Sequence, residues 1–342
     1  MSRSYCALYV DAGYLLAATA TRVSGSSLRA GVIVDHQRLI EKLIHQVEEA
    51  SKMPLLRVNW YDSGGRPGGN PDEQQEKIGM LPRVKLRLGR LSYGGEQKGV
   101  DLRIGLDLAT HSRNRIVDIV YLLSGDDDLT EAVEEAQHLG AQVIVFAVPD
   151  KDGKPNGVSK HLWREADDVQ LVDAALIDDT VFVRQAPTPP TPGTSAAEAA
   201  ETGAAQGVPA PSTVAPKRAT PVPAGPAALP SPANMPTKRI DRPAPTHLPF
   251  DLDKVDPALL VDADEEHAIG AVASAVARTW MRTASPSERE HLLHRKPSIP
   301  PELDRALLVD LSTRLGAYEI SEPVRFRLRT RFWEAAETAA HE

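Results

Sequence analysis

The hydrophobic positions in the first half of the chain fall into short runs that predict β-strands. Runs of several apolar residues in succession are typical of strands buried on both faces of a parallel sheet. One run, at residues 84–88, alternates apolar and polar positions instead. The predicted strands cover residues 5–10, 55–61, 84–88, 117–123 and 142–148.

The segments between these runs predict helices. After Asp35, apolar residues recur at helical spacing at Leu39, Leu43, Ile44 and Val47. The order therefore alternates between strand and helix, which favours a parallel sheet with helices on both faces. The predicted fold class is α/β with a Rossmann-like sheet, followed by a small all-helical domain.

The apolar pattern stops between residues 186 and 249, a segment that holds sixteen of the chain's 28 prolines. Such a composition buries too little apolar surface to offset the entropy lost on ordering, and it predicts a disordered linker. Helical spacing returns after this segment. We therefore expect one domain at residues 1–185, the linker at 186–249 and a helical domain at 250–342.

The last predicted helix holds four arginines and three aromatic residues within nine positions. This pattern is consistent with an RNA-contacting face or with an aromatic core flanked by solvated arginines. Self-association or docking of a protein partner through residues 250–342 is an equally open expectation. The residues are Arg325, Arg327, Arg329 and Arg331, with Phe326, Phe332 and Trp333.

Charge and cysteine content narrow the possible partners. The formal net charge is −8, so any contact with nucleic acid must be a local patch. The single cysteine, Cys6, cannot form an internal disulfide, which fits a reducing, cytoplasmic location. No apolar run approaches the ~20 residues of a membrane span, so no membrane contact is expected.

The candidate chemistry lies at the ends of two strands. Asp11 ends the first apolar run, and three acids at 126–128 follow the fourth run after Ser124 and Gly125. Ligands of open α/β sheets bind at the carboxyl edge, where the strand order reverses. If the first and fourth strands are neighbours there, these acids converge. Asp101, in the first turn of a predicted helix, could complete the group, whereas Asp107 is either a supporting residue or a surface residue.

Four segments in this order resemble the NYN domain of the PIN-like nuclease superfamily. The resemblance covers about residues 4–175 and implies a Rossmann-like sheet with an acidic pocket. By motif position it assigns the pocket to Asp11, Asp101, Asp126 and Asp128, and it leaves Asp127 facing outward. The segments are residues 9–11 (YVD), 98–107 (KGVDLRIGLD), 123–129 (LSGDDDL) and 159–167 (SKHLWREAD).

The resemblance implies a metal-dependent ribonuclease. Carboxylates suit Mg²⁺ or Mn²⁺, and we expect Asp11 and Asp126 to be the principal ligands. Asp101 and Asp128 would hold a second ion or its waters, and Ser124 would support the site. One departure is that the family often has an Asn three residues after its first Asp, where this chain has Tyr14.

An acidic pocket needs cations nearby to receive RNA. Candidates for phosphate contact on the expected rim are Lys98, Lys154, Lys160, His161 and Arg164. A solvated rim without a binding role is an equally open reading.

Two other classes of function fit parts of the pattern. A catalytically weak or inactive PIN-like scaffold for RNA or protein would keep the fold without the reaction, and the missing Asn favours it mildly. A phosphatase or phospho-receiver would also place acids around Mg²⁺. A phosphatase of this kind needs a second Asp two residues after the first, and Gly13 stands there.

Overall fold

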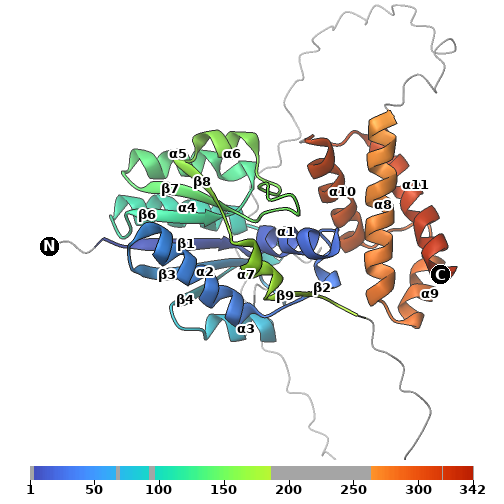
Figure 1. Ribbon diagram of the computed structural model, residues 1–342, viewed down its shortest axis with the longest axis horizontal. Coiled ribbons are helices and arrows are strands. Elements are labelled where there is room, and N and C mark those ends of the chain that lie inside the picture. Colours follow the sequence, from blue (N-terminus) through green and yellow to red (C-terminus); the bar gives the residue numbers. More distant parts are fainter. Residues whose placement is uncertain (1–3, 67–69, 92–96, 186–262, 318, 342) are drawn as a thin grey trace, which may run out of the picture. The chain divides into compact units, whose positions relative to one another are not determined.

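The computed structural model describes residues 4–66, 70–91, 97–185, 263–317 and 319–341 (Figure 1). The side chains of residues 90, 91, 97, 98 and 341 are outside this description. The predicted linker at 186–249 also lies outside it, so the three domain boundaries stay a prediction. Residues 4–185 and 263–341 are treated separately below.

A seven-stranded sheet forms the centre of residues 4–185, in the order β5-β4-β3-β1-β6-β7-β8. Six of the strands run parallel, and β5 pairs antiparallel to β4. This confirms the predicted parallel sheet. The strands are β1 (Cys6–Asp11), β3 (Leu55–Ser63), β4 (Val84–Leu91), β5 (Gln97–Lys98), β6 (Ile119–Leu123), β7 (Gln142–Ala147) and β8 (Asp168–Leu171).

The strand order reverses between β1 and β6. From β1 the chain builds outward through β3 and β4, and then it returns to add β6, β7 and β8 on the other side. The first and fourth predicted strands are thus neighbours, with Cys6 opposite Ile119 and Val10 opposite Leu123. The carboxyl edge at this switch point is where an open α/β sheet binds ligands.

Helices cover both faces of the sheet (Figure 1). One face packs against α1 (Ala12–Ser24), α2 (His36–Ser51), α3 (Glu73–Gly79) and α7 (Ala174–Asp178) around a core that includes Leu8 and Trp60. The other face packs against α4 (Val100–Arg113), α5 (Thr130–His138) and α6 (Lys160–Glu165) around Tyr9 and Leu122. Alternate residues of β1 therefore serve opposite layers, as the period of two requires.

A small second sheet was not predicted. Strand β2 (Val32–Val34) pairs antiparallel with β9 (Val181–Val183), which joins segments far apart in the sequence. Three-residue strands carry too little periodicity to be recognised, and only this long-range pairing makes them strands. Two short 3-10 helices were also missed, η1 (Arg29–Gly31) and η2 (Asp127–Leu129).

Residues 263–341 are helical, as expected. Four helices form around a core that includes Phe332 and Trp333: α8 (Ala263–Thr283), α9 (Pro286–His294), α10 (Pro301–Leu315) and α11 (Glu322–His341). Helix α9 begins at a capping box in which Ser285 and Glu288 bond each other's backbone N–H groups, as the Ser-Pro-Ser-Glu pattern predicts. In the part of the chain that the structure covers, no helix is both long and apolar enough to cross a bilayer.

Three of the four arginines of α11 are held by acids on neighbouring helices. Arg327 pairs with Glu265 and Glu266, Arg331 pairs with Glu266, and Arg329 pairs with Asp304. The aromatic residues split, because Phe332 is fully buried and Phe326 is 73% exposed. The pattern therefore describes a core flanked by ion pairs rather than a row of unpaired cations.

Substitution of Leu8 by alanine tests the central packing. Leu8 is fully buried in β1, and the cavity left by Leu8→Ala should lower the free energy of unfolding by about 2–5 kcal/mol. The matched control is Leu102→Ala on α4, where the leucine is 66% exposed and the expected change is within about 0.5 kcal/mol. Chemical denaturation followed by circular dichroism measures both, and equal losses would contradict the assigned burial.

Candidate active site

Two neighbouring strands deliver the acidic residues to one edge of the sheet. Asp11 is the last residue of β1 and also caps α1, accepting a hydrogen bond from the backbone N–H of Tyr14. Asp126 follows β6 after two residues and caps η2. Because β1 and β6 are parallel neighbours, both carboxylates lie at the carboxyl edge next to the switch point.

Asp11 is the most buried of the four predicted site acids, with 9% of its surface exposed. Its Oδ1 accepts from the Tyr14 N–H at 3.2 Å, and its Oδ2 accepts from Ser124 Oγ at 3.1 Å. Burial, together with the smaller effect of the charge of Asp101, raises the pKa of Asp11 to about 6 in spite of these two bonds. Asp11 thus holds its proton more tightly than an ordinary aspartate.

Ser124 links the two strand ends. Its hydroxyl donates to Asp11 and accepts from the backbone N–H of Asp126 at 3.3 Å. The predicted supporting role of Ser124 therefore takes the form of a direct contact with a candidate ligand. This side chain is fully buried, so the link is shielded from water.

Gly125 allows the turn to pass under the loop before α6. A Cβ at this position would lie 1.9 Å from the carbonyl oxygen of Gly157 and 2.8 Å from the ring of Tyr14. The Gly125 carbonyl in turn accepts from the Ser159 N–H at 3.0 Å. Only glycine fits this crossing of two backbone segments.

Asp101 interacts electrostatically with Asp11, and Asp101, Asp126 and Asp128 interact with one another. Burial raises the pKa of Asp101, and the charges of Asp126 and Asp128 raise it further. Burial also raises the pKa of Asp126, whose Oδ1 accepts from the Asp128 N–H at 3.1 Å. Asp126 is half-buried, whereas Asp128 is exposed. The pocket thus concentrates negative charge, and the pKa values of Asp11, Asp101 and Asp126 are all raised.

The donor chemistry of this pocket fits a hard divalent cation, since it offers carboxylate oxygens and a hydroxyl. A cation would also relieve the mutual repulsion that raises these pKa values. Among the residues that the structure describes, however, no three His, Cys, Asp or Glu side chains stand close enough to share one ion. The chemistry of the residues fits the metal, and the side chains would have to turn toward one another to hold it.

Asp127 differs from its two neighbours. Its carboxylate accepts from Ser159 Oγ at 2.6 Å and contacts Nδ1 of His161 at 3.2 Å. These hydrogen bonds hold the pKa of Asp127 below its usual value. The sequence predicts an outward-facing surface residue, but the structure gives Asp127 two partners on α6 and its cap.

The remaining predicted residues lie at different places. Asp107 bonds Tyr61 and Arg87, on the α4 side of the sheet, and makes no contact with the four acids. Lys154, Lys160 and Arg164 are exposed, and His161 is engaged by Asp127. The side chain of Lys98 lies outside the described part of the chain. The role of these cations in phosphate contact stays a prediction.

The contacts of two residues near Asp11 were not predicted. Arg29, from η1, donates from Nη2 to the Gly13 carbonyl at 3.0 Å, and its charge lowers the pKa of Asp11. Tyr14, in place of the expected Asn, donates to the Asn156 carbonyl at 2.7 Å and accepts from the Val148 N–H. No periodicity or motif marks Arg29, because only the folded loop brings it beside α1.

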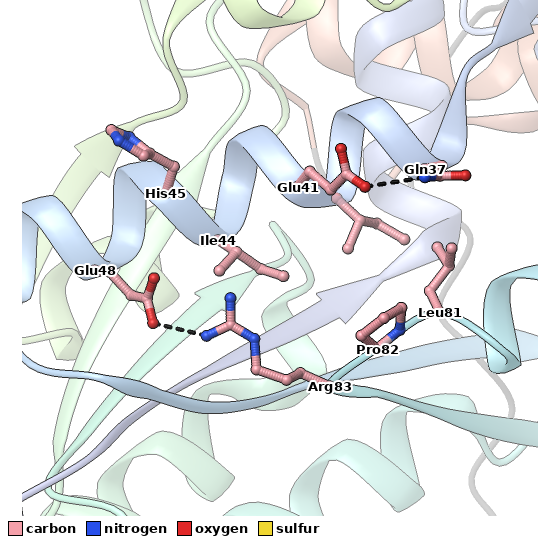
Figure 2. A pocket seen from close by; sticks show the side chains of 9 residues that line it. Gln37, Glu41, Ile44, His45, Glu48, Leu81, Pro82 and Arg83 are labelled. Atoms are coloured by element: carbon pink, nitrogen blue, oxygen red, sulfur yellow. Dashed lines mark hydrogen bonds and ion pairs between the residues drawn. The ribbon is translucent and has the colours of Figure 1, made fainter.

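A hollow of about 280 Å³ opens elsewhere, between α2 and residues 81–83 (Figure 2). Its floor is apolar, and an ion pair between Arg83 and Glu48 at 2.8 Å crosses its edge. None of the candidate site acids lines it. The hollow is therefore separate from the acidic pocket.

The crossing at Gly125 can be tested by adding a single methyl group. Gly125→Ala should lower the free energy of unfolding by about 1–3 kcal/mol, because the backbone of Gly157 must move. Gly270→Ala is the control, since open space surrounds that helical position and alanine should stabilise α8 by about 0.5–1 kcal/mol. Opposite signs in denaturation experiments are expected, and a neutral Gly125→Ala would refute the crossing.

The raised pKa of Asp11 predicts a pH-dependent cost. Its pKa is 3.8 ordinarily and about 6 in the folded chain. Stability therefore falls as the pH rises through this interval, because the unfolded chain ionises first. Asp11→Asn should raise the free energy of unfolding near neutral pH by about 1–3 kcal/mol and lose this advantage around pH 4. Denaturation with a chelator present measures both, and a destabilised variant near neutral pH would contradict the shift.

The match to a known domain family covers nearly the same residues as the seven-stranded sheet. Residues 6–173 match the family model of the NYN domain. An uncharacterised protein, y4oD, from Sinorhizobium fredii is 34% identical over 134 residues, which are 37% of this chain and 61% of that protein. The chain thus spans about three fifths of the length of this curated relative.

A solved structure is also similar to part of this chain. It is a protein of unknown function, VPA0982, from Vibrio parahaemolyticus, with 21% identity and a TM-score of 0.36. The match covers 53% of this chain and 97% of that one. Residues 6–173, which hold the six parallel strands of the sheet, are thus the part of this chain that matches the NYN domain family.

Proposed function

We propose that this chain is a metal-dependent ribonuclease that hydrolyses RNA phosphodiesters. NYN domains are nuclease-like and RNA-binding, which supports the class of reaction and of substrate. The observation that carries the proposal is the position of Asp11 beside Ser124 and Asp126 at the switch point. The family also makes a nuclease a better fit than a phosphatase or phospho-receiver.

Each acid has a proposed role. Asp11 and Asp126 are the principal ligands of Mg²⁺ or Mn²⁺, and Asp101 and Asp128 hold a second ion or its waters. When bound, such a metal lowers the pKa of a coordinated water and stabilises the oxygen that leaves phosphorus. Ser124 and the Tyr14 N–H hold the two oxygens of Asp11 in place. Their bonds favour the ionised form that a metal requires.

The cations on the rim position the substrate in this proposal. Lys98, Lys154, Lys160, His161 and Arg164 would contact phosphates without reading sequence. His161 would do so from a position fixed by Asp127. That contact is how Asp127 supports the site without joining the four acids.

A second candidate is a scaffold that binds RNA or protein without cutting. Two observations favour it: Tyr14 stands where the family often has Asn, and the acids of the described chain do not form a group of three around one point. Under this proposal the fold and the rim are retained, and the acids are only a charged surface.

Cleavage of RNA by matched variants separates the two candidates. With Mn²⁺ present, Asp126→Asn should reduce the rate at least about 100-fold, because it removes a ligand charge without changing shape. The control is Glu131→Gln, an exposed acid in the first turn of α5 that makes no contact with the pocket. Equal cleavage by wild type and Asp126→Asn would reject the assignment, and binding of RNA without cleavage by wild type would favour the scaffold.

A further inference from the structure

A second group of cations lies on the α4 side of the sheet. Residues at alternate positions of a strand share a face, and Tyr61 of β3 packs on the α4 face. Asn59 therefore lies on that face as well. The alternation is interrupted before Val58, where the register with β1 shifts, and Arg57 is assigned to the same side because its charge acts on Tyr9 and His111. Across the pairing of β3 with β4, Asn59 is opposite Lys85 and Tyr61 is opposite Arg87. Arg57, Lys85 and Arg87 thus extend over two adjacent strands.

Helix α4 adds a fourth cation beside these strands. Asp107 of α4 contacts Arg87 at 3.3 Å, which identifies the side of the helix that faces β4. Arg103 is four residues earlier and lies on the same side, one turn closer to the helix start. Together these four cations form a basic strip, made of Arg57, Lys85, Arg87 and Arg103.

The basic strip keeps most of its charge. Arg57, Lys85 and Arg103 are exposed and have no ion-pair partner within the described ranges. Arg87 contacts Asp107, but its Nε makes no well-aligned hydrogen bond there, so this is a charge contact alone. The basic strip therefore holds four cations, and within the described ranges only Arg87 pairs with a carboxylate. The net charge of the whole chain is −8.

Two cations of the basic strip, Arg57 and Arg87, act electrostatically on the same side chains, Tyr9 and His111, which places them close together. Burial is the main cause that lowers the pKa of His111, and Arg87 and Arg57 both lower it further. His111 contacts the hydroxyl of Tyr9 beneath α4. Arg57 and Arg87 thus flank one polar region.

The floor of this region is polar and fixed by hydrogen bonds. Tyr61 donates to Asp107 at 2.9 Å, and the rings of Tyr9 and Tyr61 are 5.7 Å apart. Asn59 is 1% exposed, and its Oδ1 has no hydrogen-bond partner among the residues described. These side chains are buried, so they form a fixed polar layer beneath the cations and are not themselves open to a ligand.

The basic strip begins close to the acidic pocket. Asp11 of β1 is opposite Tyr61 of β3, and Tyr61 is opposite Arg87 of β4. The backbones of Asp11 and Arg87 are thus two strand spacings apart, about 10 Å. Lys85 lies two residues behind Arg87, about 7 Å farther from the pocket along the strand. The basic strip therefore leads away from the acidic pocket in the direction opposite to α6.

We propose that the basic strip binds the phosphate backbone of a single RNA strand as it leaves the acidic pocket. A single row of cations matches one backbone rather than two, and phosphate contact of this kind positions a strand without reading its sequence. The inference rests on the proposed function only in taking RNA as the ligand. The rim on α6 and the strip on α4 and β4 then hold the strand on opposite sides of the pocket.

Binding measurements test the strip without relying on cleavage. The full chain carrying Asp126→Asn is titrated against a short fluorescein-labelled single-stranded RNA, and anisotropy is followed over a range of salt concentrations. Adding Arg57→Gln and Lys85→Gln should weaken binding about tenfold at low salt. It should also reduce the salt slope by about 1.4, or about 0.7 for each lost phosphate contact.

The matched control removes two cations from the other face of the sheet. Arg38 lies in the first turn of α2, and Lys52 directly follows the last residue of that helix. Both side chains are exposed and have no ion pair in the described chain. Arg38→Gln with Lys52→Gln changes net charge equally and should leave affinity within about twofold. Far-UV circular dichroism confirms that both double variants fold.

Three results would overturn the proposal. They are equal affinity of the two double variants, an unchanged salt slope, or no RNA binding by the parent chain. Equal affinity would show that Lys85 and its neighbours only keep the sheet edge from pairing with other chains. A chain that binds RNA through the strip but never cleaves it would leave this proposal intact and refute the nuclease.

Discussion

The parallel pairing of β1 with β6 is the constraint on which the candidate site depends. It places Asp11 and Ser124 at adjacent strand ends, where one hydrogen bond of 3.1 Å joins them. Ser124 then accepts from the Asp126 N–H, so the same hydroxyl sets the direction of the turn into η2. If β6 paired elsewhere in the sheet, at least two strand spacings, about 10 Å, would separate the strands that carry the acids. The chemistry is thus a consequence of strand order.

Bringing these acidic side chains together in a partly buried pocket has an electrostatic cost. Burial and like charge raise the pKa values of Asp11, Asp101 and Asp126 together. The structure tolerates this because the Tyr14 N–H and Ser124 offset part of the cost at Asp11, and because Asp128 remains exposed. Sites that hold several like charges together in this way are candidates for function, since packing alone would favour neutral residues.

Cations in this chain fall into two groups, those already paired and those still available. In the helical part, Arg327, Arg329 and Arg331 are held by acids and stabilise the contacts between helices. On the sheet, Arg57 and Lys85 have no ion-pair partner within the described ranges. Only the second group can bind an anion without first losing an existing contact. An acidic protein can therefore offer a local surface to RNA while its net charge remains negative.

Much of this fold could be predicted from the sequence, because local residue patterns mark its strands and helix starts. Apolar patterns marked the five main strands, and Asp35 marked a helix start through the chemistry of capping. The Asp11 and 126–128 acids were recognisable for the same reason, as charges placed directly after buried strands. The three-residue strands β2 and β9 were not, since each exists only through pairing with the other.

What the tertiary structure alone decided was which side chains meet. The spacing of residues could not show that Asp127 bonds Ser159 and His161 on α6, or that Arg29 lies beside Asp11. It also could not place Asp107 on Arg87 and Tyr61, away from the four acids. Local pattern determines where a strand or helix begins, because backbone hydrogen bonding and burial act over a few residues. The partners of a polar side chain depend on strand order and register, which only long-range packing sets.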